Sequence, residues 1–255
     1  MVWLDRLWAT LSLALLTLMF GPLERAFAAR RQRFFRRGFG TDLLFFLGQY
    51  LLWSSLVLTA LTHLHGALAD VTPLAWRAEV ARWPALAQGL FAVVIGDVCV
   101  YWFHRWQHHN AILWRFHGVH HTAERLDWLA AHREHPIDGL MTQTAVNLPV
   151  LLLGIPPDAL AALAAFRGVW AIFIHSNVRL NLGPLELLLG APALHHWHHA
   201  RDRFAGNYAN LSPLMDVLFG TWQRPPREPE AVGLTEPWPQ TWLGLLVHPF
   251  RRRSG

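Results

Sequence analysis

The sequence contains no lysine, a single cysteine and few charged residues of any kind. All 22 basic side chains are arginine. Charged residues make up 15% of the 255 positions, whereas a typical soluble domain has about a quarter. With Cys99 alone, an internal disulfide and any cysteine-based zinc or iron–sulfur site are excluded. Because 53% of the residues are hydrophobic, the composition indicates a membrane protein in which histidine would hold any metal.

The net charge of +5 does not indicate a nucleic-acid partner. The densest basic cluster, Arg30 to Arg37, lies between two apolar segments and is not interleaved with stacking aromatics along a soluble surface. Such a position is typical of a cytoplasmic loop that touches anionic lipid. We therefore expect no nucleic acid to bind, and we expect this cluster to lie on the cytoplasmic side of a membrane.

Three uncharged or nearly uncharged segments predict membrane-spanning helices, at Leu7 to Leu23, Leu43 to Ala69 and Leu86 to Phe103. The first segment could instead be a signal peptide, because Ala26-Phe27-Ala28 resembles a cleavage site. Cleavage would leave the arginine cluster outside the membrane, against the positive-inside tendency. A retained span is therefore the favoured interpretation.

Two further apolar segments, Gly139 to Leu153 and Ala159 to Ile174, flank the break Gly154-Ile155-Pro156-Pro157. They predict a helical hairpin that enters the membrane and returns. Arg167 lies midway along the second limb and should face protein or water, although the sequence suggests no partner for it. The expected fold is an all-α integral membrane protein with about three transmembrane helices, this hairpin and a cytosolic histidine-rich helical cap.

The chain divides into three expected regions. Residues 1–85 would hold the first spans and the arginine-rich cytoplasmic loop, and residues 86–221 the histidine-rich region. Residues 222–255 would form a proline-rich interfacial tail with the basic run Arg251-Arg252-Arg253. With the arginine loop inside, every histidine cluster falls on the cytoplasmic face. The composition hints at a GC-rich bacterial genome, so the expected location is a bacterial inner membrane.

Three histidine clusters lie beside the apolar segments. They are His104 with His108, then His117, His120 and His121, and then His195, His198 and His199. Side chains three or four residues apart share a helix face, so each cluster could aim two or three imidazoles at one point. Neutral imidazole is a common ligand for iron, zinc and copper. Eight such nitrogens are too many for one metal, so the spacing predicts a pair of metals.

Other residues could complete this site. Asp97 shares a helix face with His104 and is expected to accept a hydrogen bond from a ligand imidazole, although a structural bond to a neighbouring helix is the alternative. His175, at the end of the hairpin, could add a ligand, and Asn177 could hold a metal-bound water. His135 is a further ligand candidate. The weaker or excluded candidates are His132, the spare cluster members His109 and His196, and the distant His63, His65 and His248.

The choice of metal follows from the chemistry that each permits. Two irons could use dioxygen to oxidise a C–H bond, whereas zinc could only activate water. Glu134 lies near histidines, but the sequence has no His-Glu-x-x-His motif, so a metalloprotease would lack its general base. A site that opens toward lipid, without a serine-nucleophile motif, favours C–H oxidation over hydrolysis.

The ordered motifs resemble those of the fatty acid hydroxylase and sterol desaturase superfamily, over about half the chain. They are Asp97-x-x-x-Tyr101-Trp102-x-His104-Arg105, His117-x-x-His120-His121, Arg133-x-His135-Pro136, His175-Ser176-Asn177, His195-x-x-His198-His199, Asn207-Tyr208, Asp216 and Phe219-Gly220-Thr221. The resemblance implies two non-haem irons, dioxygen as co-substrate, and the three histidine clusters as ligands, with His175 and His135 as further ones. One departure is Ala209, where the family often has glycine.

The resemblance leaves the lipid and the reaction open. Hydroxylation of a fatty acyl, sterol-like or ether lipid is the first expectation, and desaturation is the alternative. The chain has no flavin, haem or iron–sulfur motif, so electrons would come from an external ferredoxin or cytochrome docked on the arginine-rich face. A divalent-metal transporter is less favoured, because transport needs ligands at mid-membrane. A protein that has lost activity and binds lipid is the remaining alternative.

Overall fold

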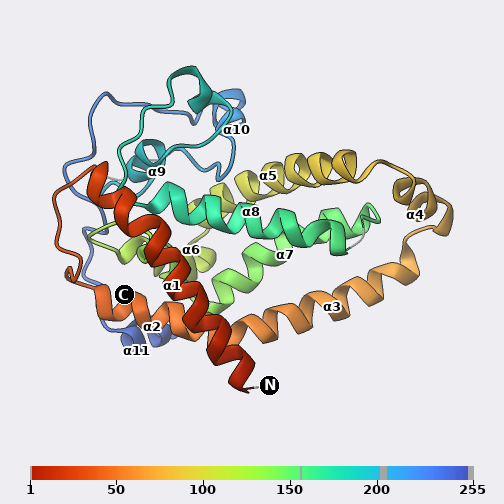
Figure 1. Cartoon of the computed structure of the whole chain (residues 1–255), viewed down its shortest axis with the longest axis horizontal. Helices are drawn as coiled ribbons and strands as arrows, with labels where there is room; N and C mark the ends of the chain where they lie inside the picture. The colour runs from red at the N-terminus through yellow and green to blue at the C-terminus, as the bar shows by residue number, and fades with distance from the viewer. Residues whose placement is uncertain (1, 156, 202–205, 252–255) are drawn as a thin grey trace.

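The computed structural model describes residues 2–155, 157–201 and 206–251, and over these ranges its regular elements are helices. Long helices extend along the molecule, and short helices and loops gather at one end (Figure 1). The predicted all-α class is confirmed for this part of the chain. Pro156 of the expected Gly/Pro break, and Arg252 and Arg253 of the expected basic run, lie outside the described residues.

Three helical segments are long and apolar enough to cross a membrane, as predicted, namely Arg6–Ala26, Phe39–Leu68 and Ala85–His109. The first lies within α1 (Val2–Ala26), and the third is α5 (Ala85–His109). The second combines α2 (Phe39–Gly48), a π-helical turn (Gln49–Trp53) and most of α3 (Ser54–Val71). The predicted spans therefore agree with the structure, with ends that differ by a few residues.

The predicted hairpin consists of α7 (Pro136–Leu152) and α8 (Pro157–His175). Gly154, between them, has a φ of +76°, a left-handed conformation that favours glycine. Both helices pack against α5. At the far end of the molecule, α4 (Leu74–Ala81) connects α3 to α5 (Figure 1). The histidine-rich elements lie at the opposite end.

Short helices build the histidine-rich end. They are α6 (Ala111–His117), α9 (Pro192–His198), α10 (Leu214–Leu218) and α11 (Trp242–Val247). The side chain of Asn110 caps α6 by accepting hydrogen bonds from the backbone of Ile112 and Leu113. Pro192 begins α9, where its missing N–H costs nothing. These local signals break the chain into segments that can each present a histidine from a different direction.

The terminal segments pack against the rest of the molecule. Phe20 of α1 lies in a buried core with residues of α2 and α8. Leu245 of α11 is fully buried against Phe45 and Val119. The tail of residues 222–255, which the sequence predicted to be interfacial, therefore packs in part against α2. The proline-rich stretch of this tail connects the histidine-rich end to α11, which packs through Leu245.

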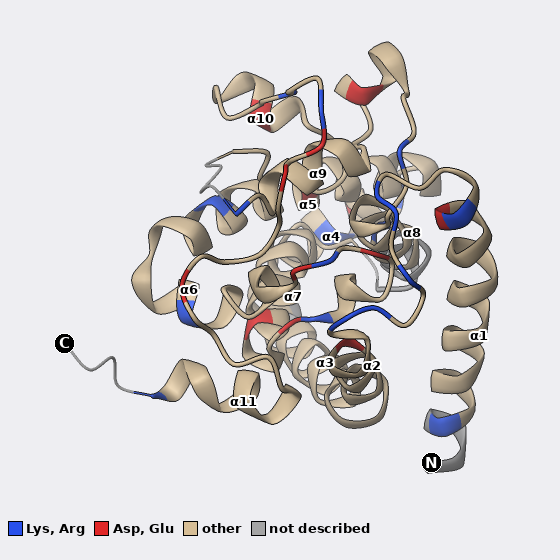
Figure 2. Cartoon of the chain, turned by 90° about the vertical axis from the view of Figure 1, so that its left-hand side faces the viewer, with Lys and Arg blue, Asp and Glu red and all other residues tan. Residues whose placement is uncertain are grey.

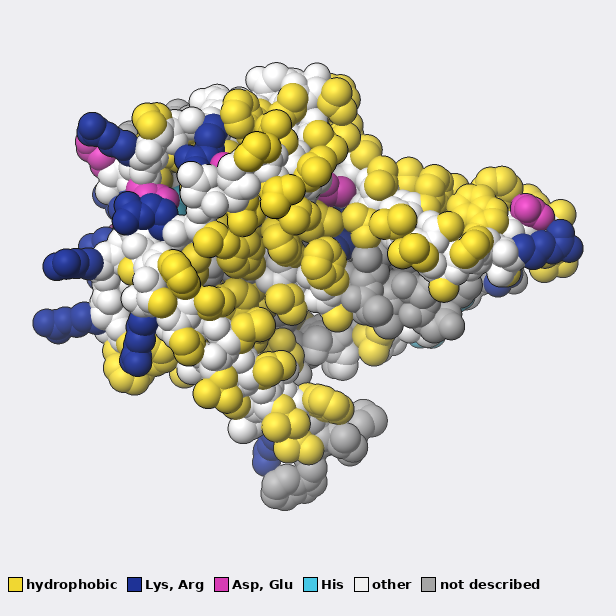
Figure 3. All heavy atoms as spheres, turned by 45° about the horizontal axis from the view of Figure 1, so that its top comes forward, with side chains coloured by type: hydrophobic (Ala, Val, Ile, Leu, Met, Phe, Trp, Pro, Cys, Tyr) yellow, Lys and Arg dark blue, Asp and Glu magenta, His cyan; other side chains and the backbone are white. Residues whose placement is uncertain are grey.

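The surface divides by chemistry. Leucines such as Leu15, Leu56 and Leu86 point outward from the long helices and are well exposed, as a lipid-facing surface would require. Hydrophobic side chains cover much of the face in Figure 3, while several arginine side chains project on its left and a smaller charged group lies at its right-hand tip. Figure 2 views that end directly and shows charged residues along its loops. The polarity of the surface therefore matches a helical body in lipid with a charged end outside it.

A buried ion-pair network fixes the loops at the charged end. Asp42, on the first turn of α2, lies between two arginines: its carboxylate is 2.7 Å from Arg36 and also pairs with Arg133. Arg36 in turn pairs with Asp127. All four side chains are buried. Such a network is costly to break, because removing one partner leaves an uncompensated charge away from water.

Candidate metal centre

Nine histidines converge in two groups, and within each group one ring nitrogen from every member lies within 4.8 Å of the others. The first group is His104, His108, His117, His121 and His198. The second group is His120, His175, His195 and His199. Among the ligand candidates named from the sequence, His135 is outside both groups. The structure thus brings residues from α5, α6, α8, α9 and the turn after α6 to one place.

The clusters do not each aim at a single point, which differs from the expectation. His117 and His121, four residues apart, belong to the first group, whereas His120 between them belongs to the second. A residue four positions along a helix is rotated by about 40°, and one three positions along by about 60° the other way. Side chains at these positions can therefore diverge toward two neighbouring sites. The third cluster divides in the same way, with a pair four residues apart in the second group.

Backbone carbonyls fix how several of the rings are oriented. Four rings donate Nδ1–H to a carbonyl, from His104 to Tyr208 (2.7 Å), from His198 to Gly206 (2.9 Å), from His120 to Arg133 (3.2 Å) and from His175 to Ala171 (2.6 Å). A carbonyl oxygen only accepts, so Nδ1 must carry the proton. Each Nε2 then has a free lone pair that points into its group.

The lone pairs face one another at short range. His120 Nε2 lies 2.9 Å from His175 Nε2 in the second group, and His104 Nε2 lies 3.1 Å from His117 Nε2 in the first. Ligands about 2.1 Å from a metal lie about 3.0–3.4 Å apart when they are neighbours in its coordination shell. With both protons held on Nδ1, only a cation between the nitrogens would stabilise such a pair. The donor set therefore fits a metal in each group.

Unpartnered nitrogens in the same place lead to the same conclusion. The Nε2 atoms of His108 and His198 are buried and have no hydrogen-bond partner among the described residues. Burial of an unsatisfied polar atom costs free energy, so each such atom calls for a partner. Imidazole nitrogen suits iron, and the two atoms belong to the first group.

Burial also keeps these rings neutral. It lowers the pKa of His117 to about 3, and it lowers the pKa of His121 and His199 well below the ordinary value. Neighbouring imidazoles lower the pKa of the last two further, because positive charges in one cluster repel. The rings are therefore neutral at neutral pH, with a proton on one nitrogen and a lone pair on the other, and this is the form that binds metal.

A carboxylate on α7 supports the first group. Asp138 accepts a hydrogen bond from His117 Nδ1 at 3.0 Å and another from Gln107 Nε2 at 2.6 Å. A carboxylate behind a ligand imidazole fixes the ring and makes it more basic. Neither Asp138 nor Gln107 was predicted to be functional. The sequence signal that could have identified Asp138 is its position directly before the apolar hairpin limb, where a carboxylate is unusual.

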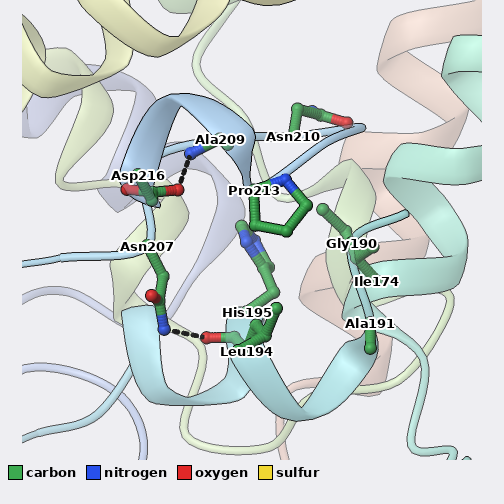
Figure 4. Close-up of a pocket in the computed structure, with 10 residues that line it drawn as sticks. All are labelled: Ile174, Gly190, Ala191, Leu194, His195, Asn207, Ala209, Asn210, Pro213 and Asp216. Atoms are coloured by element: carbon green, nitrogen blue, oxygen red, sulfur yellow. Dashed lines mark hydrogen bonds between the residues drawn. The ribbon is translucent and has the colours of Figure 1, made fainter. Parts of the chain in front are cut away.

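One loop, residues 206–212, carries carbonyls that orient two ligands of the first group. Asp216 accepts hydrogen bonds from the backbone N–H groups of Tyr208 and Ala209, at 2.8 Å each. Asn207 donates to the Leu194 carbonyl of α9 at 3.0 Å (Figure 4). Asn207 is the described non-glycine residue with positive φ, 55°. Ala209, where the family often has glycine, does not have a positive φ, so alanine is not strained at this position.

Asp97 differs from its expected role. Its carboxylate accepts hydrogen bonds from the backbone N–H groups of Leu211 and Ser212, at 3.1 and 3.0 Å, instead of from a ligand imidazole. Arg167, for which the sequence suggested no partner, lies 3.9 Å from Asp97 and donates to the Val93 carbonyl. Asp97 therefore orders the 206–212 loop, and its negative charge balances the positive charge of Arg167 among the helices.

Asn177 and His135 also differ from expectation. Asn177 exchanges two hydrogen bonds with the backbone of Arg30, at 2.9 and 2.8 Å, so its amide fastens the N-terminal loop. His135 Nδ1 accepts from the backbone N–H of Ile137, and its Nε2 donates to the Leu246 carbonyl. With both ring nitrogens occupied, His135 caps α7 and has no lone pair left for a metal.

The remaining histidines bind the scaffold. His132 bonds to the side chain of Gln49 at 2.9 Å. His196 is buried between Glu228 and the Ser176 carbonyl and so holds the tail against α9. These residues, which the sequence ranked as weak or spare candidates, lie outside both metal groups.

Comparison with known proteins finds one matching family and several relatives whose names describe lipid-modifying enzymes. The fatty acid hydroxylase family matches residues 89–221. The ornithine lipid hydroxylase OlsE of Rhizobium tropici is 34% identical over 68% of this chain and 53% of its own length. The human alkylglycerol monooxygenase is 36% identical over 55% of the chain and 32% of its own. The Delta(7)-sterol 5(6)-desaturase ERG3A of Gibberella zeae is 29% identical over 56% and 40%.

The chain thus aligns with about half of the first relative and with smaller shares of the others. No solved structure matches it. The matched family segment contains all nine converging histidines.

Proposed function

This chain belongs to the fatty acid hydroxylase family, and on that premise we propose that it is a membrane-bound di-iron oxygenase that hydroxylates a C–H bond of a lipid. The carrying observation is the pair of groups in which neutral imidazole nitrogens face one another at 2.8–3.2 Å. The names of the relatives, a lipid hydroxylase, a monooxygenase and a sterol desaturase, support lipid oxidation.

Hydroxylation is favoured over desaturation by the comparisons. The hydroxylase and the monooxygenase share 34% and 36% identity with the chain, whereas the desaturase shares 29%. Desaturation is the second candidate, because the same family includes it. A metal transporter is less well supported, since the two histidine groups lie at the end of the helices and not along a path through them.

The histidines of the first and second groups would each hold one iron. Two bound irons supply the redox chemistry that activates dioxygen when electrons are provided. The protein's own contribution is to hold the ligands in one tautomer. Asp138 and the carbonyls of Tyr208 and Arg133 do so from outside the ligand shell. Seven of the nine rings are buried, and His104 and His108 are half-buried, so the ligand residues limit the access of water to the site.

The experiment that tests this proposal measures metal and oxygen together. The full chain, purified in detergent from iron-replete cells, should contain two irons and consume dioxygen when reductant is added. Mass spectrometry of added lipids should then find products heavier by one oxygen, or lighter by two hydrogens if the reaction is desaturation. Zinc alone, with no oxygen uptake after anaerobic iron reconstitution, would contradict the proposal. Metal uptake by proteoliposomes would instead support a transporter.

The arginine-rich end supports a site for an external electron donor. Arg30 bonds to Asn177, two residues after the ligand His175, and to the Glu230 carbonyl of the tail. The exposed Arg31 and Arg33 follow directly. A small acidic ferredoxin or cytochrome would be attracted to this surface. Turnover with such a donor should slow as ionic strength rises, and turnover that is insensitive to salt would contradict this docking site.

The same geometry supports the proposed location. The arginine loop and the two histidine groups lie at one end of the long helices, and α4 lies at the other (Figure 1). By the positive-inside rule, the site would face the cytoplasm of a bacterial inner membrane. Labelling of an introduced cysteine at Arg33, compared with one at Trp76 in α4, from each side of the membrane tests this orientation.

A further inference from the structure

A cavity of about 170 Å³ lies among α5, α7 and α8, next to the metal centre. Its apolar lining is valine, alanine and glycine. Its polar lining is Thr142, Gln143 and Asn147 of α7, Arg167 of α8, and Asn210 of the 206–212 loop. Gln143 and Gly168 are exposed whereas Val150 is buried, so the cavity opens on the outer surface of the hairpin. A purely structural void between membrane helices would be expected to be apolar.

Arg167 has donors to spare in this cavity. Arginine carries five N–H donors and no acceptor. Among the described residues, Arg167 makes one hydrogen bond, to the Val93 carbonyl at 3.2 Å. It lies 3.9 Å from Asp97, beyond hydrogen-bond range. An arginine within a bundle of apolar helices is expensive unless its donors are satisfied. The group that enters the cavity must therefore offer acceptor oxygens.

The charge balance selects a neutral group. Asp97 already supplies one negative charge beside Arg167, and its two oxygens each accept a backbone N–H. A second anion would place two negative charges near one cation in a low-dielectric setting. The side-chain amides of Gln143 and Asn147 offer both donors and acceptors. A hydroxyl, or the carbonyl of an ester or amide, matches these requirements.

The cavity is connected to both histidine groups through the backbone. Ala171, which lines it, accepts the Nδ1–H of His175 in the second group. Asn210 lies two residues after Tyr208, whose carbonyl orients His104 in the first group. Arg167 precedes His175 by eight residues on one helix, or about 12 Å along its axis. The cavity lining therefore includes a residue whose backbone orients a ligand of the second group and one from the loop that orients ligands of the first.

We propose that this cavity is a second part of the substrate site, in which Arg167 binds an uncharged oxygen-bearing group of a lipid chain. The bound group is an ester or amide carbonyl, which only accepts hydrogen bonds and so matches the donors of Arg167, two turns of α8 before the ligand His175. This proposal rests on the proposed function for the identity of its ligand as a lipid. In this proposal, Arg167 and the side-chain amides of α7 determine which lipid binds and which of its carbons reaches the metal centre.

Glycines in and near the cavity provide the variants that test this. An ideal Cβ at Gly168 would meet nothing within 4 Å, so Gly168→Leu fills the cavity without a clash at Cβ and favours the helix. Gly89, on α5 away from the cavity, is equally open and gives the matched control Gly89→Leu. At Gly96 a Cβ would lie 2.7 Å from Arg167 Nη1, so Gly96→Ala displaces the guanidinium.

Binding is measured by equilibrium dialysis of the iron-free full chain in detergent with four radiolabelled C16 probes. The probes are hexadecanamide, methyl hexadecanoate, the hexadecanoate anion and hexadecane. We expect the amide or the ester to bind at least about tenfold more tightly than hexadecane, which corresponds to a single good hydrogen bond to a charged group. Whichever of these two probes binds more tightly identifies the carbonyl as that of an amide or of an ester. Gly168→Leu and Gly96→Ala should remove this preference, and Gly89→Leu should keep it.

Equal binding of hexadecanamide, methyl hexadecanoate and hexadecane would overturn the proposal, as would tightest binding of the anion. An unchanged preference for the amide or ester in the Gly168→Leu variant would also overturn it. Because the probes bind without iron, this result is independent of catalysis. If the chain selects the amide but oxidises no lipid, the cavity site is supported and the proposed function is contradicted. If the chain oxidises lipid without any preference among the probes, the proposed function is supported and the cavity site is contradicted.

Discussion

The two histidine groups are supported in different ways. The first group is backed by the backbone carbonyls of Tyr208 and Gly206 and, in addition, by a side chain, because Asp138 holds His117. The second group is backed by backbone carbonyls at Arg133 and Ala171, and the Nδ1 atoms of His195 and His199 have no partner among the described residues. Metals bound by the two groups would therefore not be equivalent.

This difference in support also determines which substitutions would disturb each histidine group. A side-chain substitution at Asp138 changes the support of the first group directly. The second group depends on the position of the Arg133 backbone, which the Asp42–Arg133 ion pair fixes from a distance.

Removal of a ligand should have the largest effect. His120→Ala removes one of the four nitrogens of the second group, and we expect the iron content to fall sharply. His248→Ala, at a histidine outside both groups, should leave it unchanged. Metal analysis of the purified variants measures both. Equal iron retention in the two would contradict the ligand assignment.

Disruption of the remote ion-pair network should destabilise the fold. Asp42→Asn leaves two buried arginines with less countercharge, and we expect a loss of about 3–5 kcal/mol in the free energy of unfolding. Arg37, whose side chain is 78% exposed, pairs with Glu124, so Arg37→Gln should cost less than about 1 kcal/mol. Chemical unfolding in detergent gives both values. A similar cost for the two would show that the buried network contributes little.

Neutralisation of Asp138 should weaken one metal and spare the other. Asp138→Asn removes the carboxylate behind His117, and we expect the affinity of the first group to fall about 10–100-fold. The second group, which has no contact with Asp138 among the described residues, provides the control within the same molecule. Chelator competition that resolves two irons measures both affinities. An equal loss at both groups would contradict the proposed difference in support.

The smallest effect is expected from a single hydroxyl. Tyr101, on α5, is hydrogen-bonded to Thr221 at 2.9 Å, and Thr221 in turn donates to Asp216 beneath the 206–212 loop. Tyr101→Phe should lower the unfolding free energy by about 0.5–1.5 kcal/mol. The hydroxyl of Tyr50 has no hydrogen bond to a described residue, so Tyr50→Phe should change it less. A larger change at Tyr50 would contradict the role given to the Thr221 contact.

The sequence predicted the helices well, because apolar length and Gly/Pro breaks are local signals. The ends of α7 and α8 fall close to the expected hairpin limbs for this reason. The distribution of ligands between two groups was not predictable, since His120 and His121 are neighbours in sequence yet face different groups. That choice depends on the turn after α6 and on where α8 and α9 present their own histidines.

The roles of Asp97, Asn177 and His135 were also beyond the reach of spacing alone. A polar residue near a metal motif can bind the metal, a ligand or the backbone, and in the structure all three bind backbone groups. Asp138 was missed for the converse reason, because its partner His117 lies 21 positions away. Such contacts are set by tertiary packing, for which one sequence carries no periodic signal.

The Asp97–Arg167 pair bears on how the protein is made. On insertion scales, a lone aspartate or arginine at the centre of a membrane helix costs about 2.5–3.5 kcal/mol. Asp97 belongs to α5 and Arg167 to α8, and the ribosome completes α5 first. We therefore expect α5 to enter the membrane before its countercharge is made. Its stable insertion would follow when α7 and α8 arrive, so we expect these three helices to assemble in the bilayer as one unit.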